Sequence, residues 1–352
     1  MPNKNLQAAK TAKKNEFYTQ FSDIQKEVNA YLEYNPDVFR DKTILLPCDD
    51  PEWSNFTRFF AQNFENFGLR KLISTSYAIE SKQYKTEWQP TLFETKKPYY
   101  DIDKSKTHGK IFVLTHDTNQ NGHIDIEDLE WEYLQGDGDF HSPEVCALRD
   151  EADIIVTNPP FSMFREFLAW IMEAGKKFLI IGNMNAIPYK EVFPLIKENK
   201  LWLGTNDVRW FYQGDVNSDL YEAAHSRWFT NLDHGRHHQP MELMTFADNI
   251  KFSKHKEVKG FGYLHYYNYD AIDIPHSDAI PSDYDGVMGV PISWLDKYCP
   301  EQFEILDCRE PASELELLKK RPKFVEYKSR QIYVNGVLCQ KSYHRLLIRK
   351  KQ

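Results

Sequence analysis

The fold of this chain is decided by one short stretch, Asp153-Ile154-Ile155-Val156-Thr157-Asn158-Pro159-Pro160-Phe161. Its apolar part, residues 154–156, predicts a buried parallel strand. Two prolines follow soon after, and proline cannot donate to a strand ladder, so the strand must end in a stiff, extended turn. Residues 163–174 then have the spacing of an amphipathic helix. Open α/β sheets place reactive groups in this setting, at the carboxyl end of a strand.

The polar turn suits the methylation of an exocyclic amino nitrogen. Such a nitrogen is a poor nucleophile because its lone pair is delocalised into the ring. The side-chain oxygen of Asn158 and the backbone carbonyl of Pro159, which Pro160 leaves free, can accept both amino hydrogens and so direct the lone pair at a methyl donor. Phe161 offers a flat face on which a base can stack after leaving the duplex. Taken alone, the four residues also fit an ordinary turn.

Composition limits the class of protein. The chain has 352 residues, of which 41% are hydrophobic and 14% aromatic, enough for a large core in one or two domains. Its five cysteines are scattered and form neither a disulfide framework nor a zinc-ligand spacing. The lysine-rich residues 1–14 lack the apolar segment of a secretory signal, and no apolar run approaches the roughly 20 residues of a membrane span. We therefore expect a cytoplasmic protein with no membrane partner.

Charge is unevenly distributed along the chain. The net charge is −8, which argues against nucleic acid, but the placement of charge matters more than its sum. Residues 319–351 carry many Lys and Arg side chains against the single acid Glu326. Aromatic residues such as Tyr327, Tyr333 and Tyr343 interleave with these charges, so this basic unit should be folded. A solvated surface is the alternative to a phosphate-binding face.

Strand and helix patterns alternate from residue 23 to about residue 203 and predict one doubly wound α/β sheet. The expected strands are 43–46, 72–77, 110–114, 178–181 and 201–203, in addition to the one at 154–156. The expected helices are 23–32, 53–67, 126–134 and 191–198. After residue 206 the pattern changes to short, aromatic, β-like segments and a short helix at 292–297. The chain should end in a pair of strands at 331–334 and 343–349, and Asn335-Gly336 is a strong hairpin-turn signal.

A second motif matches the calcium-binding loop pattern. In the stretch 117–128, oxygen-bearing side chains stand at loop positions 1, 3, 5, 9 and 12, which are Asp117, Asn119, Asn121, Asp125 and Asp128. Gly122 occupies the sharp turn at position 6, and His123 would offer its backbone carbonyl at position 7. The entering segment reads as a strand, and position 12 is Asp in place of the usual Glu. The loop therefore predicts either a structural Ca²⁺ site or a tight turn without metal.

These stretches, in this order, resemble the EcoRI-type adenine-specific DNA methyltransferases. The resemblance covers nearly the whole chain. It is carried by Asn15-Glu16-Phe17-Tyr18-Thr19-Gln20, Cys48-Asp49-Asp50-Pro51-Glu52-Trp53-Ser54-Asn55-Phe56, Leu72-Ile73-Ser74-Thr75, Gly136-Asp137-Gly138-Asp139-Phe140, Asn158-Pro159-Pro160-Phe161, Asp207-Val208-Arg209-Trp210-Phe211 and Tyr284-Asp285-Gly286-Val287-Met288-Gly289-Val290-Pro291. Several long stretches in a fixed order are specific, whereas Asn-Pro-Pro-Phe alone is not.

The resemblance implies S-adenosylmethionine as methyl donor, adenine N6 in duplex DNA as acceptor, and a class-I, Rossmann-like methyltransferase fold. It implies an AdoMet-binding and catalytic domain at 1–205, and a completion of the sheet with a DNA target-recognition region at 206–352. It also allows a cognate restriction endonuclease that acts separately.

Site residues follow from the order of the motifs. Phe17, Tyr18 and Thr19 would hold the methionine end of the cofactor, and Asp49 would lie in the crevice at the end of the first strand. Asp139 would accept a hydrogen bond from the cofactor's adenine amino group, and Phe140 would pack on that ring. The alternative for Phe17 and Tyr18 is a pair of aromatic side chains in the core, and the alternative for the Asp-Gly-Asp run at 137–139 is a surface turn.

The sequence departs from the common pattern of AdoMet enzymes in two places. Asp49-Asp50-Pro51-Glu52 stands where a glycine-rich turn usually follows the first strand, as it does in the EcoRI-type family. The acid that usually binds the ribose is not evident, and the nearby candidates are Ser74, Thr75, Ser76 and Glu80. Two other functions remain open: a protein-glutamine or RNA methyltransferase, and a non-catalytic DNA- or calcium-binding protein on the same fold.

Overall fold

The computed structural model describes residues 17–47, 49, 54–78, 100–213, 220–223 and 225–351. The chain forms two compact units. The first unit comprises Met1–Asn183 and Leu203–His234, and the second comprises Met184–Trp202 and Gly235–Gln352. No helix within the described ranges is long and apolar enough to cross a membrane.

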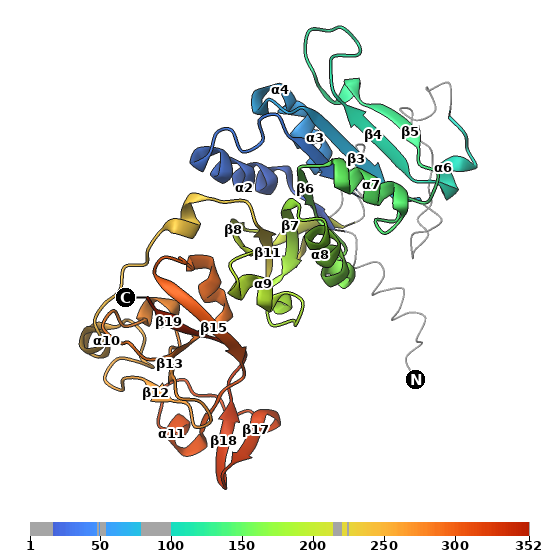
Figure 1. The fold of residues 1–352 in the computed structure, drawn as a ribbon. Helices are drawn as coiled ribbons and strands as arrows, with labels where there is room; N and C mark the ends of the chain where they lie inside the picture. Colours follow the sequence, from blue (N-terminus) through green and yellow to red (C-terminus); the bar gives the residue numbers. More distant parts are fainter. Residues whose placement is uncertain are drawn as a thin grey trace, which may run out of the picture. The chain divides into compact units, whose positions relative to one another are not determined.

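The first unit is built on an eight-stranded mixed sheet with strand order β5-β4-β3-β2-β6-β7-β11-β8 (Figure 1). Its strands are β2 (Thr43–Leu46), β3 (Lys71–Ser76), β4 (Lys110–Leu114), β5 (Glu130–Tyr133), β6 (Ile154–Thr157), β7 (Lys177–Asn183), β8 (Trp202–Asp207) and β11 (Ser226–Thr230). The four central strands, β3, β2, β6 and β7, run parallel, whereas β4 pairs antiparallel with β3 and β5, and β11 pairs antiparallel with β7. The predicted parallel unit of β2, a helix and β3 is confirmed.

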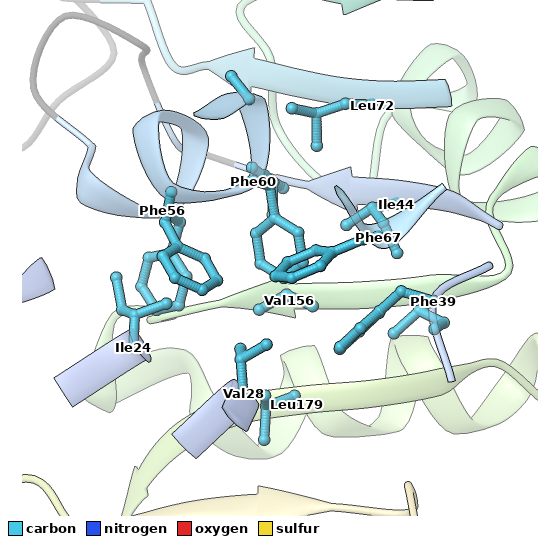
Figure 2. Close-up of a cluster of buried hydrophobic side chains, with 14 of the residues drawn as sticks. Ile24, Val28, Phe39, Ile44, Phe56, Phe60, Phe67, Leu72, Val156 and Leu179 are labelled. Carbon is cyan, nitrogen blue, oxygen red and sulfur yellow. The ribbon is translucent and has the colours of Figure 1, made fainter. Parts of the chain in front are cut away.

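Helices cover both faces of this sheet. They are α2 (Phe21–Tyr34), α3 (Asn55–Gln62), α4 (Phe64–Phe67), α6 (Lys104–Thr107), α7 (Pro143–Glu151) and α8 (Phe164–Glu173), with 3-10 turns η2 (Ile126–Asp128) and η3 (Phe161–Met163). On one face, Phe56 and Phe60 of α3 pack with Val28 of α2 against Ile44 and Val156 in the sheet (Figure 2). On the other face, α8 approaches so closely that a Cβ on Gly182 of β7 would overlap the ring of Phe164. Burial of both strand faces explains why β6 is continuously apolar.

Local signals set several helix ends. The Ser54 side chain accepts a hydrogen bond from the amide of Phe56 and caps α3, and Ser142 caps α7 in the same way. Gly68 ends α4 in the left-handed conformation, with φ of +63°. The predicted helix 53–67 is interrupted at Asn63, and helix 23–32 is confirmed as α2.

A small sheet, β1-β9-β10, belongs to the same unit. It consists of β1 (Phe17–Thr19), β9 (Trp210–Gln213) and β10 (Leu220–Glu222), and both outer strands pair antiparallel with β9. The C-terminal end of β8 is held by Glu27 of α2, a buried carboxylate that accepts hydrogen bonds from the backbone amides of Thr205 and Asn206 at 2.9 and 2.8 Å. The hydroxyl of Tyr31 donates to the same carboxylate at 2.9 Å.

The second unit contains a five-stranded sheet, β12-β13-β14-β19-β15, and a three-stranded sheet, β16-β18-β17. Its strands are β12 (Leu264–His265), β13 (Ile272–Asp273), β14 (Met288–Pro291), β15 (Phe303–Arg309), β16 (Ala312–Glu314), β17 (Gln331–Val334), β18 (Val337–Lys341) and β19 (Arg345–Lys350). Its helices are α9 (Phe193–Lys197), α10 (Phe246–Phe252) and α11 (Leu315–Lys319), with 3-10 turns η4 (Met184–Ala186), η5 (Gly235–His238), η6 (Ser277–Ala279), η7 (Ile292–Lys297) and η8 (Lys328–Arg330).

Two sequence-based expectations about elements were wrong. Residues 126–134 form the short turn η2 and then strand β5, because Trp131 faces the core and pairs opposite Phe112 of β4. The expected pairing of 331–334 with 343–349 is also wrong. The Asn335-Gly336 turn does form a hairpin, with both residues at positive φ, but it joins β17 to β18. Strand β19 lies between β14 and β15 in the larger sheet.

Candidate active site

The carboxyl ends of the central parallel strands bring the candidate residues together. Strands β2, β3 and β6 run parallel and adjacent, so Asp49, Ser76 and Asn158 all follow or end a strand at the same edge of the sheet. This edge is the crevice in which open α/β sheets bind their ligands. The sequence placed Asn158 at a strand end, and the structure confirms that placement.

The turn after β6 is compact. Pro159 is buried, and Asn158 and Pro160 are partly buried. The backbone carbonyl of Pro160 accepts a hydrogen bond from the amide of Met163 at 2.9 Å, which starts η3 and leads into α8. The ring of Phe161 packs on the core of the first unit and meets Phe211 edge-on. A rigid turn of this kind holds its polar groups in one geometry.

Strand β1 lies beside this turn through β9. Thr19 pairs opposite Phe211, and Tyr18 opposite Tyr212. The Thr19 carbonyl accepts a hydrogen bond from the side chain of Asn55 at 2.8 Å, which ties β1 to the start of α3. Thr19 is 3% exposed, and its hydroxyl oxygen has no hydrogen-bond partner in the described part of the chain. A buried hydroxyl in this position fits a bound polar ligand. The placement of Phe17 rests on its backbone in β1 alone.

Asp49 lies between the ends of three elements. It is 9% exposed, and its two carboxyl oxygens accept hydrogen bonds from the hydroxyls of Ser54 and Thr157, each at 2.7 Å. The hydroxyls of Thr57 and Ser74 both donate to its backbone carbonyl. Asp49 is therefore embedded in hydroxyl groups from α3, β3 and β6.

The loop 136–140 packs against the carboxyl end of β3. The carbonyl of Asp137 accepts a hydrogen bond from the amide of Ala78 at 2.7 Å, and a Cβ on Gly138, whose φ is +85°, would overlap the carbonyl of Ser76. The carboxylate of Asp139 lies 2.9 Å from Nδ1 of His141. Phe140 is 4% exposed and packs edge-on against Phe167 and Trp170 of α8. The glycine thus lets the loop lie directly on the end of β3.

The candidates for ribose binding are buried at the end of β3. Ser74 and Thr75 are fully buried, and Ser76 is 7% exposed with its hydroxyl accepting from the amide of Lys110. Glu80 lies outside the described residues, as do Asp50 and residues 51–53. Sequence reasoning assigned no role to Ser54, Thr157 or Phe211, although all three lie in the stretches quoted for the strand turn and the family resemblance. For Ser54 the cap position before α3 was a further local signal.

The structure does not support calcium in the loop 117–128. Asp128 is buried, and its Oδ1 accepts hydrogen bonds from the amides of Thr118 and Asn119 at 2.8 and 3.0 Å, while its Oδ2 accepts from the amide of Asp125. The carboxylate of Asp117 likewise accepts from the amides of Asn121 and Gly122. The oxygens that would bind the ion thus close the loop on its own backbone. The helix expected after the loop is strand β5.

Among the described residues, potential metal-ligating side chains gather elsewhere. His255, Glu257 and His276 in the second unit bring one ligand atom each within 4.8 Å of the others. The two imidazole rings are stacked with 10° between their planes, so a single ion cannot lie in both ring planes. Glu257 is already paired with Lys323 at 3.0 Å. This cluster has the character of an ion-pair network.

Known proteins similar to this chain match it over most of its length. An adenine-specific methyltransferase EcoRI family model matches residues 5–351. The type II methyltransferase M.EcoRI of Escherichia coli is 40% identical over 90% of this chain and 92% of its own length. M.MpnI of Mycoplasma pneumoniae is 32% identical over 98% of this chain and 97% of its own, and M.MgeORF184P of Mycoplasma genitalium is 34% identical over 98% of each. No solved structure gives a significant match.

A mixed α/β sheet with polar turns at the carboxyl ends of its central strands is consistent with a methyltransferase fold. The chain belongs to the EcoRI family of adenine-specific methyltransferases. The protein is accordingly an enzyme, a DNA methyltransferase whose methyl donor is S-adenosylmethionine.

Proposed function

We propose that this enzyme methylates N6 of an adenine that has been flipped out of duplex DNA onto Asn158-Pro159-Pro160-Phe161. The observation that carries the proposal is the position of this turn at the carboxyl end of β6, with Thr19 and Asp49 at the same site. The central parallel strands and the helices on both faces support a class-I, Rossmann-like methyltransferase sheet.

In the proposed mechanism the turn activates the adenine amino group. The side-chain oxygen of Asn158 and the carbonyl of Pro159 each accept one amino hydrogen, so the nitrogen becomes pyramidal and its lone pair points out of the ring plane. S-adenosylmethionine supplies an activated methyl group on a sulfonium centre. The partly buried Phe161 stacks on the flipped base and fixes its height above the turn. Because the donors and acceptors are preorganised, no rearrangement is needed as charge develops on the base.

The cofactor would lie along the ends of β1, β2 and β3. Tyr18 and Thr19, with Phe17, would hold its methionine end, and the buried Thr19 hydroxyl supports this role. Asp139 would accept from the adenine amino group of the cofactor. Phe140 contributes through its small exposed edge, since most of the ring packs on α8. Asp49 closes the crevice between β2 and β6.

DNA recognition is assigned to the C-terminal half, with the catalytic domain at 1–205 and the recognition region at 206–352. The basic unit 319–351 supports this assignment. Tyr333 and Tyr343 are 74% and 63% exposed there, and the guanidinium of Arg330 lies 4.5 Å from the centre of the Tyr343 ring. Basic groups with exposed aromatic rings suit phosphate and base contacts. A cognate restriction endonuclease acting on the same DNA sequence would be the partner enzyme.

The direct test is incubation of the protein with labelled S-adenosylmethionine and unmethylated genomic DNA, followed by mapping of the modified positions. N6-methyladenine at one recurring sequence is the expected product. Label in protein or RNA, but not in DNA, would favour the protein-glutamine or RNA methyltransferase. An absence of transfer with retained DNA binding would indicate a non-catalytic protein.

A further inference from the structure

Asp49 and Thr157 join the ends of two neighbouring strands through their side chains. The backbone pairing of β2 with β6 matches Ile44 with Ile154 and Leu45 with Ile155. Beyond these pairs, the Thr157 hydroxyl donates to Oδ2 of Asp49 at 2.7 Å and lies 3.0 Å from the carbonyl of Pro47. The side chains thus continue the link between the strands up to the residue that precedes Asn158.

We propose that Asp49 is a positioning residue for Asn158, acting through Thr157, and is not itself a ligand of the methyl donor. This inference rests on the proposed function of Asn158. Each carboxyl oxygen of Asp49 accepts a short hydrogen bond from a protein hydroxyl, Thr157 on one side and Ser54 on the other. Both partners are themselves buried, at 1% and 2% exposed.

The chemistry of the contact requires a carboxylate. Both partners are hydroxyls that donate, and an ionised carboxylate offers acceptors on both oxygens. Hydrogen bonds to a charged acceptor are shorter and about twice as strong as neutral ones. An Asn side chain offers one acceptor oxygen and one amino group, so only one of the two hydroxyls could still donate to residue 49. The hydrogen bond between Thr157 and Asp49 therefore fixes the direction in which the chain leaves β6.

Asn158 comes directly after Thr157 in the chain, and the two rigid prolines that follow it cannot absorb a local displacement of the backbone. A shift in Thr157 is therefore passed on to the Asn158 oxygen. Misplacement of a catalytic group by about 1 Å can cost on the order of 10²-fold in rate. Ser54 caps α3 and also donates to Asp49, so the same carboxylate ties the start of α3 to this position.

The test is a double-mutant cycle in the full-length enzyme, with turnover and the dissociation constant of S-adenosylmethionine measured separately. Asp49→Asn and Thr157→Val should each lower kcat by at least about tenfold. The double variant should be no slower than the slower single variant, because both changes break one contact. The affinity for S-adenosylmethionine should stay within about twofold, and Thr157→Ser, which keeps the hydroxyl, should restore turnover.

Two outcomes would overturn the inference. A large loss of S-adenosylmethionine affinity in Asp49→Asn with normal turnover in Thr157→Val would make Asp49 a cofactor ligand. Additive losses in the double variant would mean that the residues act independently. Thr230→Val is the matched control, because Thr230 is fully buried and its hydroxyl donates to the carbonyl of Phe178 at 2.7 Å in the same sheet. It should lower the melting temperature but not kcat. Wild-type turnover in Asn158→Ala would refute the proposed function itself, whatever the cycle gives.

Discussion

The ring of Phe161 meets the ring of Phe211 edge-on, with 6.2 Å between ring centres and 84° between planes. Phe211 is fully buried in β9 and pairs opposite Thr19 of β1. Phe161, which is proposed to stack on the target base, therefore packs against β9, the strand that pairs with Thr19 of the proposed cofactor site. This contact fixes the position of the base-binding residue relative to the cofactor-binding strand.

Replacement of Asn158 with Ala should lower kcat by about 10²–10³, because it removes an acceptor aimed at the developing transition state. Binding of S-adenosylmethionine should remain at the wild-type level, since the residues proposed to hold it lie on other strands. Single-turnover methylation and equilibrium binding of the cofactor provide the two measurements. Near wild-type turnover would contradict the assignment.

Replacement of Phe161 with Leu should weaken binding of the flipped base, because a base–aromatic stack contributes about 1–3 kcal/mol. The expected loss in affinity for target DNA is about tenfold, with the cofactor affinity unchanged. Fluorescence of 2-aminopurine at the mapped target position would report the stacked base directly. Phe161→Tyr keeps the ring and serves as the control. Equal fluorescence in Phe161→Leu and wild type would argue that the base stacks elsewhere.

Neutralising the basic unit should flatten the salt dependence of DNA binding. Lys320 and Lys328 are exposed there, and Lys320→Ala with Lys328→Ala should reduce the slope of log K against log salt by roughly one unit per lost phosphate contact. Lys26→Ala, an exposed lysine on α2, is the control. If the slope stays the same, DNA phosphates must contact the region 207–259 instead.

Glu27 should give the enzyme a characteristic pH dependence of stability. Burial raises the pKa of this carboxyl above its ordinary 4.5, although hydrogen bonds from Thr205 and Asn206 oppose the rise. A raised pKa means that the folded state binds the proton more tightly than the unfolded chain. Its contribution is therefore fully present below pH 4.5 and declines as pH rises through the folded-state value.

The measurement for Glu27 is urea unfolding of wild type and Glu27→Gln across pH 4 to 8. The difference in unfolding free energy should move in favour of the Gln variant as pH rises. Glu27→Ala should be destabilised by about 1–3 kcal/mol at any pH, because the buried amides of Thr205 and Asn206 lose their acceptor. A pH-independent difference between wild type and Glu27→Gln would contradict the raised pKa.

The loop 117–128 should be indifferent to calcium. Asp128→Asn should cost about 0.5–2 kcal/mol, the range for lost caps, because its carboxylate completes the capping box of η2 at the amide of Asp125 and also accepts from the amides of Thr118 and Asn119. Burial acts to raise the pKa of Asp128, but the hydrogen bonds from Asp125, Asn119 and Thr118 outweigh it and hold the pKa below 3.8. That stability is present above pH 3.8 and is lost as pH falls through the folded-state pKa. A rise in melting temperature with millimolar calcium would restore the metal site.

Local sequence patterns predicted much of the first unit. The apolar runs gave β2, β3, β6 and β7, and the prolines after Asn158 fixed where β6 ends, because each rule depends on residues close together in the chain. The same reliance on nearby residues gave a wrong prediction at 126–134. The spacing there resembles that of a helix, but residues 130–133 pair with β4 as a strand. Edge strands take their conformation from the neighbour that pairs with them, so their own pattern is a weak guide.

The order of the motifs was enough to indicate the family and the chemistry at Asn158. Only the tertiary structure decided what supports that residue. Asp49 and Thr157 are 108 residues apart in the chain, and Phe161 meets Phe211 from a different sheet. The first contact exists because parallel strands gather their carboxyl ends at one edge of the sheet, and the second because β9 of the small sheet lies against η3. No local periodicity records which side chains meet in either case. Hydrogen bonds that form only in the folded chain also decided two other features. They pair β17 with β18, and they join the Asp128 carboxylate to backbone amides of the loop 117–128.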